Sequence, residues 1–448
     1  MGKPRVSIHW FRRDLRLEDN HGLYRALADH SDVLPLFIFD TEILEELEEK
    51  RDRRVDFIHR TLRELKPALE KHGGSLLVEH GAPIDCWKRV LEKYEVTAVT
   101  VNHDHEPYAN ERDKAVSAWL KSRGIELRSF KDISLFERAE VMKDDGTPYT
   151  VFTPYARKWR AQFKHDMVEP FASAEKLTAL HRTAPLPMPS LKDIGFQPTD
   201  LDTPPMEVSE ELLRKYHLTR NTPGIQGTSR MSVHLRFGTV SPRALMKQAL
   251  EINGSFANEL IWREFFMQIL WHFPHVVTKA FKPPYDAIEW RNNEKEFAAW
   301  CEGRTGYPLV DAGMRELNAS GHMHNRVRMV VASFLTKHLL IDWRWGEAYF
   351  ARILLDFELS SNNGNWQWAS GSGCDAAPYF RVFNPTIQQQ KFDPELTYVK
   401  RWLPEYGGKD YAAPIAVHDV ARKRAIEAYK TALDGGRKRE ERQHELFS

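Results

Sequence analysis

The run NNGNWQW at residues 362–368 has the most distinctive chemistry in the chain. Residues 362–364 are typical of a turn that breaks the helical pattern before them. Trp366 and Trp368 follow, and a loop of small residues that carries Arg381 comes next. A segment so rich in glycine, alanine and tryptophan can wrap a planar ligand, although a tight loop around core tryptophans would have the same composition.

The segment NELIWREFF places a carboxylate beside an aromatic ring. Glu259 and Trp262 are three residues apart, so on a helix they are neighbours on one face. Such a pair could hydrogen-bond a heterocyclic base inside a pocket. An amphipathic helix with a buried tryptophan explains the same spacing.

The segment HMHNRVRM carries an amide, two arginines and an apolar side chain. Asn325 and Met329 lie one helical turn apart, whereas Arg326 and Arg328 point to different faces. One arginine could pair with an internal acid while the other meets solvent or phosphate. A solvated basic helix start is the alternative.

Residues 227–232, GTSRMS, combine small and hydroxyl side chains, and Tyr216 lies upstream. Glycine, threonine and serine together supply backbone N–H and hydroxyl donors, which suit a pyrophosphate. An ordinary helix N-cap would use the same residues.

Two kinds of element must position these residues. Apolar runs typical of buried parallel strands occupy residues 6–11, 33–39, 75–78, 98–101 and 126–130. Charged amphipathic segments between them, such as 56–72 and 110–123, are typical of crossover helices. We therefore predict an α/β domain with a doubly wound parallel sheet over residues 1–131. No GxGxxG follows the first strand, which argues against a nicotinamide-type dinucleotide site.

The remainder of the chain reads as a linker followed by helices. Proline and polar residues cluster within residues 132–205, as in interdomain linkers. No convincing strand pattern follows, so we predict an all-α domain over residues 206–448. Its predicted helices cover residues 207–218, 241–252, 258–273, 310–321, 325–337 and 345–356.

Composition limits the partners and the compartment. Lys+Arg at 64 nearly cancels Asp+Glu at 63, so a nucleic acid would have to meet a local basic face. The three cysteines are far apart, which predicts no disulfide framework, no metal cluster and a cytoplasmic location. No apolar run reaches the roughly 20 residues of a membrane span, and the N-terminus lacks a secretory apolar region.

Together these motifs resemble the DNA photolyase/cryptochrome family. WFRRDLRLEDN at residues 10–20 matches the family's opening, and further motifs follow in the family's order and spacing: TSRMS, ELIWREF, TGYPLVDAGMREL, HNRVRM and NNGNWQWASGSGCDAAPYFRVFNP. The resemblance spans essentially the whole chain. It implies an N-terminal α/β domain, an interdomain connection and a helical domain that holds FAD.

The resemblance also implies a cofactor site. Arg328 and Asp356 would form the family's buried ion pair beside the flavin, and Asn362 would face flavin N5. Glu358 stands where the family usually has aspartate. The implied FAD-binding residues are Tyr216, Thr228, Ser229, Arg230, Met231, Ser232, Arg328, Asp356, Glu358 and Asn362.

By the same resemblance, the substrate is a cyclobutane pyrimidine dimer in UV-damaged DNA. Trp262 and Trp368 would wall the lesion pocket, Glu259 and Asn325 would hydrogen-bond the thymine edges, and Met329 would fill the floor. Members that repair (6-4) lesions have histidines in the motif occupied here by HNRVRM, and the iron–sulfur branch needs four cysteines. The implied DNA contacts are Arg220, Arg326, Arg381 and Gln388, and the implied electron relay from flavin to surface is Trp366, Trp343 and Trp290.

An antenna chromophore is left open by the sequence. Asn110 and Glu111 match a folate-binding pair of part of the family, but FDTEILEELEEKRDRR after the second strand departs from the folate pattern. A deazaflavin, a second flavin or no antenna are the other readings.

Two other functions compete with repair. A cryptochrome-type photoreceptor would share FAD and the tryptophans, but we expect it to show a long C-terminal extension or a degraded lesion pocket. A flavin-binding electron-transfer protein would show no preference for irradiated DNA. We expect a monomer without a metal.

Overall fold

The computed structural model describes residues 2–447, with side chains up to residue 435. The chain folds into two compact units. The first comprises residues up to Glu140, Trp159–Val208 and Arg230–Leu260; the second comprises Val141–Lys158, Ser209–Ser229 and the chain from Ile261 onward. Each unit is assembled from segments that are far apart in the sequence. The division therefore does not test the domain boundaries expected at residues 131 and 205, which stay predictions.

A five-stranded parallel sheet forms the centre of the first unit. Its strands are β1 (Arg5–Phe11), β2 (Val33–Asp40), β3 (Leu77–Gly81), β4 (Glu95–Asn102) and β5 (Glu126–Phe130), in the spatial order β3-β2-β1-β4-β5. All five predicted strands are present and parallel, which confirms the fold class. The third begins two residues later than predicted, because the Ser75 hydroxyl bonds the Glu70 carboxylate (3.1 Å) outside the sheet.

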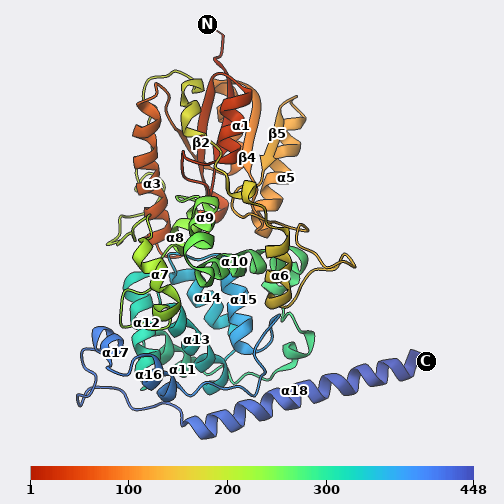
Figure 1. Ribbon diagram of the computed structural model, residues 1–448, viewed down its shortest axis with the longest axis vertical. Coiled ribbons are helices and arrows are strands. Elements are labelled where there is room, and N and C mark those ends of the chain that lie inside the picture. The colour runs from red at the N-terminus through yellow and green to blue at the C-terminus, as the bar shows by residue number, and fades with distance from the viewer. Residues whose placement is uncertain (1, 448) are drawn as a thin grey trace. The chain divides into compact units, whose positions relative to one another are not determined.

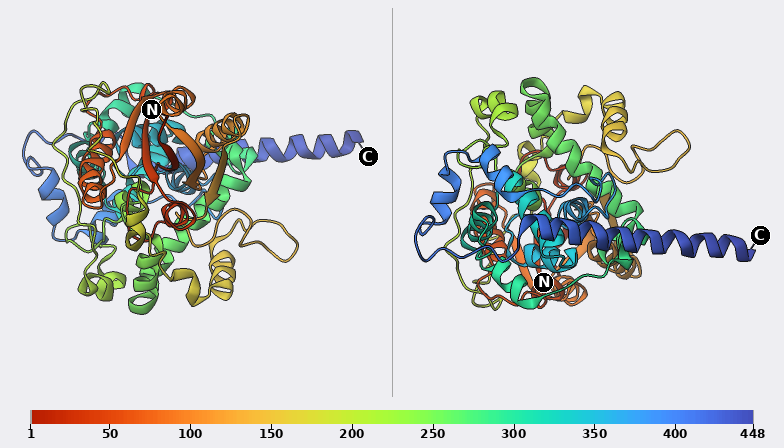
Figure 2. Two further views of the ribbon diagram at one scale, coloured as in Figure 1. Left: turned by 90° about the horizontal axis from the view of Figure 1, so that it is seen from above. Right: turned by 90° about the horizontal axis from the view of Figure 1, so that it is seen from below.

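Helices cover both faces of this sheet. Alternate side chains of β1 point to opposite faces, so neighbouring residues of this strand meet different helices. Trp10 meets Trp87 of α4 (Pro83–Lys93) edge-on, with ring centroids 5.7 Å apart. On the other face, a Cβ at Gly22 of α1 (His21–Asp29) would lie 3.0 Å from the His9 ring, so glycine permits this close approach. In the spatial order of the strands, the direction reverses between β1 and β4, as in doubly wound sheets. The ribbon views show helices on either side of the sheet (Figures 1 and 2).

A buried ion network holds residues 230–260 within the first unit. Arg243 donates to Asp19 (2.8 Å) and to Asp132 (2.7 Å), and Arg16 also pairs with Asp132 (2.7 Å). Pairing of this kind is required when charges are buried. The other helices of this unit are α2 (Thr41–Leu44), α3 (Arg53–Glu70), α5 (Pro107–Lys121), η1 (His165–Val168), η2 (Ala174–Ala179), α8 (Ser232–Phe237) and α9 (Pro242–Ile252).

The second unit is helical, as predicted, and no strand follows β5 within residues 2–447. Two helices, α6 (Phe152–Gln162) and α10 (Gly254–His272), contribute residues to both units. The others are α7 (Glu210–Thr219), η3 (Pro274–Val277), η4 (Pro283–Ala287), α11 (Glu294–Cys301), α12 (Pro308–Ser320), α13 (Asn325–Ser333), the π-helical turn Phe334–His338, α14 (Trp343–Ile353), α15 (Leu359–Ser370), α16 (Pro385–Phe392), α17 (Thr397–Trp402) and α18 (His418–Phe447).

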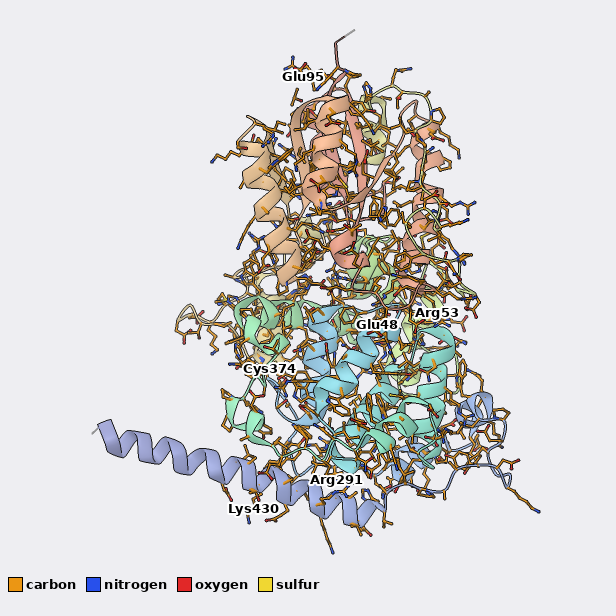
Figure 3. All side chains as sticks on the ribbon, turned by 180° about the vertical axis from the view of Figure 1, so that it is seen from behind. Glu48, Arg53, Glu95, Arg291, Cys374 and Lys430 are labelled. Carbon is orange, nitrogen blue, oxygen red and sulfur yellow. The ribbon has the colours of Figure 1, made fainter. Side chains whose placement is uncertain are left out.

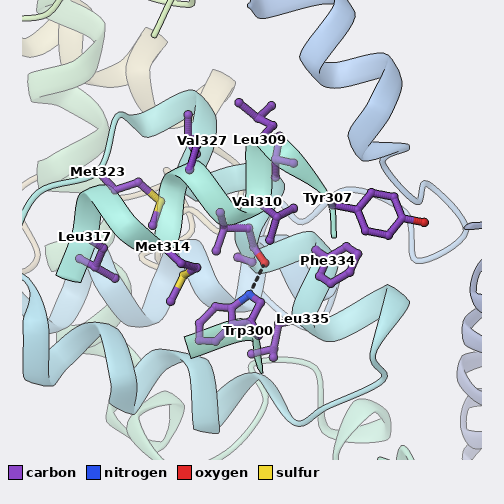
Figure 4. Packing of buried hydrophobic residues seen from close by; sticks show 14 of the residues in the cluster. Trp300, Tyr307, Leu309, Val310, Met314, Leu317, Met323, Val327, Phe334 and Leu335 are labelled. Atoms are coloured by element: carbon purple, nitrogen blue, oxygen red, sulfur yellow. Dashed lines mark hydrogen bonds between the residues drawn. The ribbon is translucent and has the colours of Figure 1, made fainter. Parts of the chain in front are cut away.

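A large aromatic and aliphatic cluster forms the core of the second unit (Figure 4). Trp300 lies fully buried within it, and its indole N–H donates to the Val331 carbonyl (3.2 Å). Burying an indole without such a partner would be costly. A second cluster fastens the first turns of α18, where Tyr429 and Ala425 pack against Ile288 and Leu340.

The prediction that residues 362–364 form a turn is wrong, because they lie inside α15. Asparagine disfavours helices when its side chain bonds nearby backbone. Here Asn363 Nδ2 donates instead to the Val276 carbonyl (2.9 Å), and Gln367 Nε2 donates to the same oxygen (2.9 Å). A Cβ at Gly364 would lie 2.2 Å from the Phe266 ring, so glycine is required by packing rather than by a turn.

The three cysteines, Cys86, Cys301 and Cys374, are free thiols. Cys374 is labelled in Figure 3. Burial raises the pKa of Cys86 to about 11 and that of Cys301 and Cys374 to about 12, so thiolate reactivity is suppressed. Among the helices of residues 2–447, none combines the length and the apolar composition needed to cross a membrane.

Candidate functional site

The start of α13 holds the arginine that the sequence pairs with an internal acid. Arg328 Nη2 lies 2.9 Å from Asp356 Oδ2, and its Nε donates to the Met323 carbonyl (2.7 Å). The Asp356 side chain is 4% exposed and that of Arg328 24%, so the acid is the more deeply buried partner. The expected ion pair is therefore present, and its place beside a flavin stays a prediction.

The N-terminal end of α15 gathers two more of the predicted cofactor residues. Glu358 is the N-cap of α15; its carboxylate lies 3.6 Å from Arg263 and accepts the Ser361 hydroxyl (2.9 Å). The longer side chain in place of the family's aspartate is thus occupied by protein partners. One turn along, the buried Asn362 donates through Nδ2 to Glu347 Oε1 (3.0 Å) and to the Glu347 carbonyl (3.1 Å).

Glu347 of α14 is a functional candidate that the sequence reasoning missed. Burial raises the pKa of its carboxyl group to about 7, an effect that the hydrogen bond from Asn362 opposes. The group can therefore hold or release a proton near neutral pH, directly against the side chain predicted to face flavin N5. No motif pointed to it, because its partner lies fifteen residues away on another helix.

The two predicted lesion-pocket walls are half-buried tryptophans on different helices. Trp262 belongs to α10, and Trp368 belongs to α15. Phe152 of α6, which the sequence reasoning also missed, stacks on Trp262 with ring centroids 3.6 Å apart. An aromatic ring already supported on one face can offer the other face to a planar or apolar ligand.

The remaining predicted pocket residues lie at helix starts or within helices. Asn325 is the first residue of α13 and is exposed, and Met329 follows one turn later, half-buried. Glu259 is half-buried and lies in α10 three residues before Trp262. The division between the two compact units falls within α10, after Leu260.

The three predicted relay tryptophans differ in burial. Trp366 and Trp343 are each 2% exposed within the helical core, and Trp290 is half-buried at its margin. Burial therefore separates only Trp290 from the other two, and the order of the relay stays a prediction. A Cβ at Gly346 would lie 2.1 Å from the Trp366 ring, so this glycine lets the indole lie against α14. The Trp290 ring meets Tyr429 edge-on at 5.9 Å.

The predicted pyrophosphate segment joins the end of α7 to the start of α8. Tyr216 is buried on α7, and Thr228 and Ser229 are half-buried beyond its end. Arg230 has a left-handed φ of 53°, Met231 is buried as the N-cap of α8, and Ser232 opens that helix and is exposed. The hydroxyl-rich segment is therefore an irregular loop before a short helix.

The predicted DNA contacts include two neighbouring arginines. Arg326 donates to Asn221 Oδ1 (2.7 Å) and its guanidinium lies 4.4 Å from the centre of the Phe392 ring. Burial and the charge of Arg220 lower the pKa of Arg326, which indicates two like charges held close together. Such a pair attracts an anion. Arg381 is exposed, and Gln388 is half-buried on α16.

The antenna prediction falls on α5 of the first unit. Asn110 Nδ2 donates to the Glu106 carbonyl of its own helix start (3.0 Å), and Glu111 is exposed. Nearby, at the carboxyl end of β2, the Tyr108 hydroxyl donates to Asp40 (2.6 Å), and burial raises the pKa of that acid. Neither arrangement identifies a chromophore.

Known proteins match this chain along most of its length. Residues 7–175 match the family model described as DNA photolyase, and residues 256–409 match the FAD binding domain of DNA photolyase. The deoxyribodipyrimidine photo-lyase of a Synechococcus strain is 36% identical, over 93% of this chain and 94% of that protein. That of Escherichia coli is also 36% identical, over 96% and 99%.

Solved structures agree with this match. The class III photolyase of Agrobacterium tumefaciens has a TM-score of 0.85 at 34% identity and covers 96% of this chain and 98% of its own. An archaeal photolyase from Sulfolobus tokodaii with two FAD molecules has a TM-score of 0.81 at 34% identity, with coverage of 95% and 100%. A Synechocystis cryptochrome has the same TM-score at 25% identity, with coverage of 96% and 100%.

These matches confirm the α/β and helical fold classes and the FAD binding domain that the motifs predicted. Among the side chains described up to residue 435, no group of three or more histidines, cysteines, aspartates or glutamates is placed to hold a metal ion. Residues 256–409 of the helical unit are thus an FAD-binding domain, and the chain belongs to the DNA photolyase family.

Proposed function

We propose that this protein is a deoxyribodipyrimidine photo-lyase, which splits cyclobutane pyrimidine dimers in UV-damaged DNA under blue light. When bound in reduced form, FAD supplies the light-excited electron for this reaction. The curated relatives at 36% identity support the assignment, because they carry this enzyme name over nearly the full length of the chain.

The observation that carries the proposal is the arrangement of α15. Asn362 and Trp366 are four residues apart and lie on one face of the helix, whereas Trp368 is two residues further and about 200° around the axis from Trp366. The predicted cofactor contact and the first relay residue thus share a face, and the predicted lesion wall points elsewhere. One rigid helix would hold the relay and the substrate apart.

The polar groups near α15 fit a flavin nucleotide. Asp356, Glu358 and Asn362 are each less than 10% exposed, and each has a protein partner. Because satisfied buried polar groups are rigid, they would orient a cofactor without moving. Arg328 would add positive charge beside the flavin ring, and Asn362 can both donate and accept a hydrogen bond.

The residues of the lesion pocket would act by contact and exclusion of water. Trp262 and Trp368 would meet an extruded dimer by van der Waals packing. Asn325, exposed at the start of α13, and Glu259 would hydrogen-bond the thymine edges, and Met329, one turn after Asn325, would contact the dimer. A dimer already disrupts stacking, so its extrusion costs less than that of normal bases.

The DNA backbone would meet the basic and polar side chains of the second unit. Contacts of this kind go mostly to phosphate, so they position the duplex without reading its sequence. Each phosphate contact also makes binding weaker as salt rises. We assign these contacts to Arg220, Arg326, Arg381 and Gln388.

The proposal is tested by illuminating the purified, FAD-loaded protein with DNA that contains cyclobutane dimers. Dimers should disappear in the light and persist in the dark, and (6-4) lesions should persist in both. Denaturing release should yield one FAD per chain. A protein that binds FAD but leaves dimers intact after chemical reduction would overturn the proposal.

The competing functions predict different results in this assay. A cryptochrome-type photoreceptor would absorb light without removing dimers, and a simple electron-transfer flavoprotein would bind irradiated and undamaged DNA equally. The Synechocystis cryptochrome shares the fold, so fold likeness does not separate signalling from repair.

A cytoplasmic location and a monomeric state are further parts of the proposal, whereas the antenna is open between a folate, a deazaflavin, a second flavin and none. The Sulfolobus tokodaii relative has two FAD molecules. Chromatography of the released chromophores would show whether this protein holds a folate, a deazaflavin or a second flavin besides the catalytic FAD. Size-exclusion chromatography would test the monomer.

A further inference from the structure

Three aromatic side chains surround Trp262, and Phe152 is the nearest of them. The Phe152 and Trp262 rings are almost parallel, with an interplanar angle of 6° and centroids 3.6 Å apart. Phe265 meets the indole edge-on at 5.5 Å, and Phe266 is stacked against it with an interplanar angle of 28° and centroids 5.5 Å apart. A ligand that stacks on Trp262 must therefore use the face that Phe152 does not cover.

Phe152 is itself held in place from two sides. It is the first residue of α6, and its backbone N–H donates to Asp375 Oδ2 (3.1 Å) in the loop after α15. A carboxylate at a helix N-terminus is electrostatically favourable. One turn later, the Tyr155 ring lies 5.3 Å from that of Phe265 on α10. The first turns of α6 therefore pack against α10 beside the stacked pair.

The stacked pair is not simply part of the hydrophobic core. Phe152 and Trp262 are both half-buried, whereas Phe265 is fully buried and Phe266 is 5% exposed. Core packing is therefore provided by the inner two rings, and the outer two form a supported aromatic wall that solvent reaches. Tryptophan, with its large apolar ring and a polar N–H, is enriched at binding surfaces.

We propose that Phe152 is the positioning residue of the lesion pocket, and that it holds the indole of Trp262 in the orientation that receives the extruded dimer. This inference rests on the proposed function, because it assigns Trp262 to the lesion pocket. Without the stack the indole gains rotational freedom, and dimer binding must then order the ring. The flavin chemistry and the phosphate contacts involve other residues, so they should be unaffected.

The test compares three variants of the FAD-loaded protein. Phe152→Leu keeps an apolar side chain but removes the flat ring, and Phe152→Tyr keeps the ring. Phe163→Leu is the matched control, because Phe163 is also half-buried and stacks on a tryptophan, Trp159, with an interplanar angle of 6°. The measurements are Kd for dimer-containing and undamaged duplexes, KM and kcat of light-driven repair, and FAD content.

Phe152→Leu should raise Kd and KM for dimer-containing DNA about tenfold, equivalent to about 1.4 kcal/mol. Its Kd for undamaged DNA, its kcat at saturating DNA and its FAD content should match the parent. Phe152→Tyr should restore dimer affinity, and Phe163→Leu should behave as the parent.

Several results would overturn the inference while leaving the proposed function intact. These are a Phe152→Leu variant with parental dimer affinity, one that loses affinity for both duplexes equally, one that loses kcat or FAD, or a Phe152→Tyr variant as weak as Phe152→Leu. If the parent protein itself repairs no dimers, the proposed function fails instead.

Discussion

Replacing Glu347 with glutamine isolates the effect of one half-buried ionisable group. The Glu347 carboxyl accepts a hydrogen bond from Asn362 Nδ2 at 3.0 Å, and burial raises its pKa from 4.5 to about 7. Glutamine has nearly the same shape and keeps an acceptor oxygen for Asn362. The substitution therefore removes the ionisation while leaving most of the packing in place.

The sign of the stability effect follows from where the proton is held. Below about pH 4.5 both the folded and the unfolded protein carry the proton, and the raised pKa costs nothing. As the pH rises toward 7, the unfolded chain ionises first and the folded state loses relative stability. The loss is complete above about pH 7, where the folded state carries a buried charge. Each pKa unit corresponds to about 1.4 kcal/mol, so the full loss is about 3 kcal/mol.

The assay is the free energy of unfolding in urea for both proteins, at a series of pH values from about 5 to about 8. Glu347→Gln should be more stable than the parent by an amount that grows with pH and levels off above about pH 7. The matched control is Glu289→Gln, which changes an exposed glutamate in the same helical unit. It should show a small difference that does not depend on pH.

A stability difference between Glu347→Gln and the parent that stays constant across this pH range would refute the reasoning. A carboxyl group that titrates in this range must change its protonation state, and the stability difference must change with it. A difference that shrinks as the pH rises would have the wrong sign. An infrared band for a protonated carboxyl group near neutral pH, present in the parent and lost in Glu347→Gln, would identify the group directly.

Three more predictions concern the relay, the packing of α15 and the DNA surface. Trp290→Phe and Trp343→Phe should block photoreduction of oxidised FAD with an external reductant, followed by absorbance, because phenylalanine keeps much of the volume but is much harder to oxidise than indole; chemically prereduced variants should repair dimers at the parental rate. Gly364→Ala should lower the free energy of unfolding by about 1–3 kcal/mol, because its Cβ would lie 2.2 Å from the Phe266 ring; unchanged thermal unfolding would contradict this. Arg381→Ala should weaken binding to dimer-containing and undamaged DNA alike, and should reduce the slope of log affinity against log salt by about 0.9; an unchanged slope would remove Arg381 from the phosphate contacts.

The sheet could be predicted from the sequence because of how parallel strands are buried. Both faces of such a sheet are covered at its centre, so β1, β2 and β4 are short, largely apolar runs that stand out from the charged helices around them, whereas the edge strand β5 is only partly buried. The fifth predicted strand matches β5 (Glu126–Phe130) residue for residue. The other predicted strands differ from the observed ones only at their ends. Local hydrogen bonds, such as that of the Ser75 side chain, determine where a strand begins or ends.

The helix α15 could not be predicted in the same way, because its local sequence favours a turn. Residues 362–364 favour non-helical backbone when they are considered alone. In the structure, Asn363 bonds the Val276 carbonyl, and Gly364 admits the Phe266 ring. Both partners lie roughly ninety residues away in sequence, so tertiary contacts override the local preference.

The candidate site also contains residues that the sequence could predict and others that it could not. Arg328 and Asp356 could be paired from the family resemblance, and their side chains meet at 2.9 Å. Phe152 could not be found, because its segment has the composition of a linker and its partner Trp262 lies 110 residues later. A residue that acts through a distant neighbour leaves no spacing pattern in its own segment.

Glu347 differs from Phe152, because the sequence does contain a signal for it. It lies four residues after Trp343 and three before Phe350, so it shares a helix face with two apolar side chains that are each 2% exposed. A carboxylate on an otherwise apolar face must find a partner or keep its proton. In this protein both happen: Asn362 donates to the carboxyl group, and burial raises its pKa to about 7. A lone acid on the buried face of a predicted helix is therefore reason enough to look for a titrating group, even when no motif surrounds it.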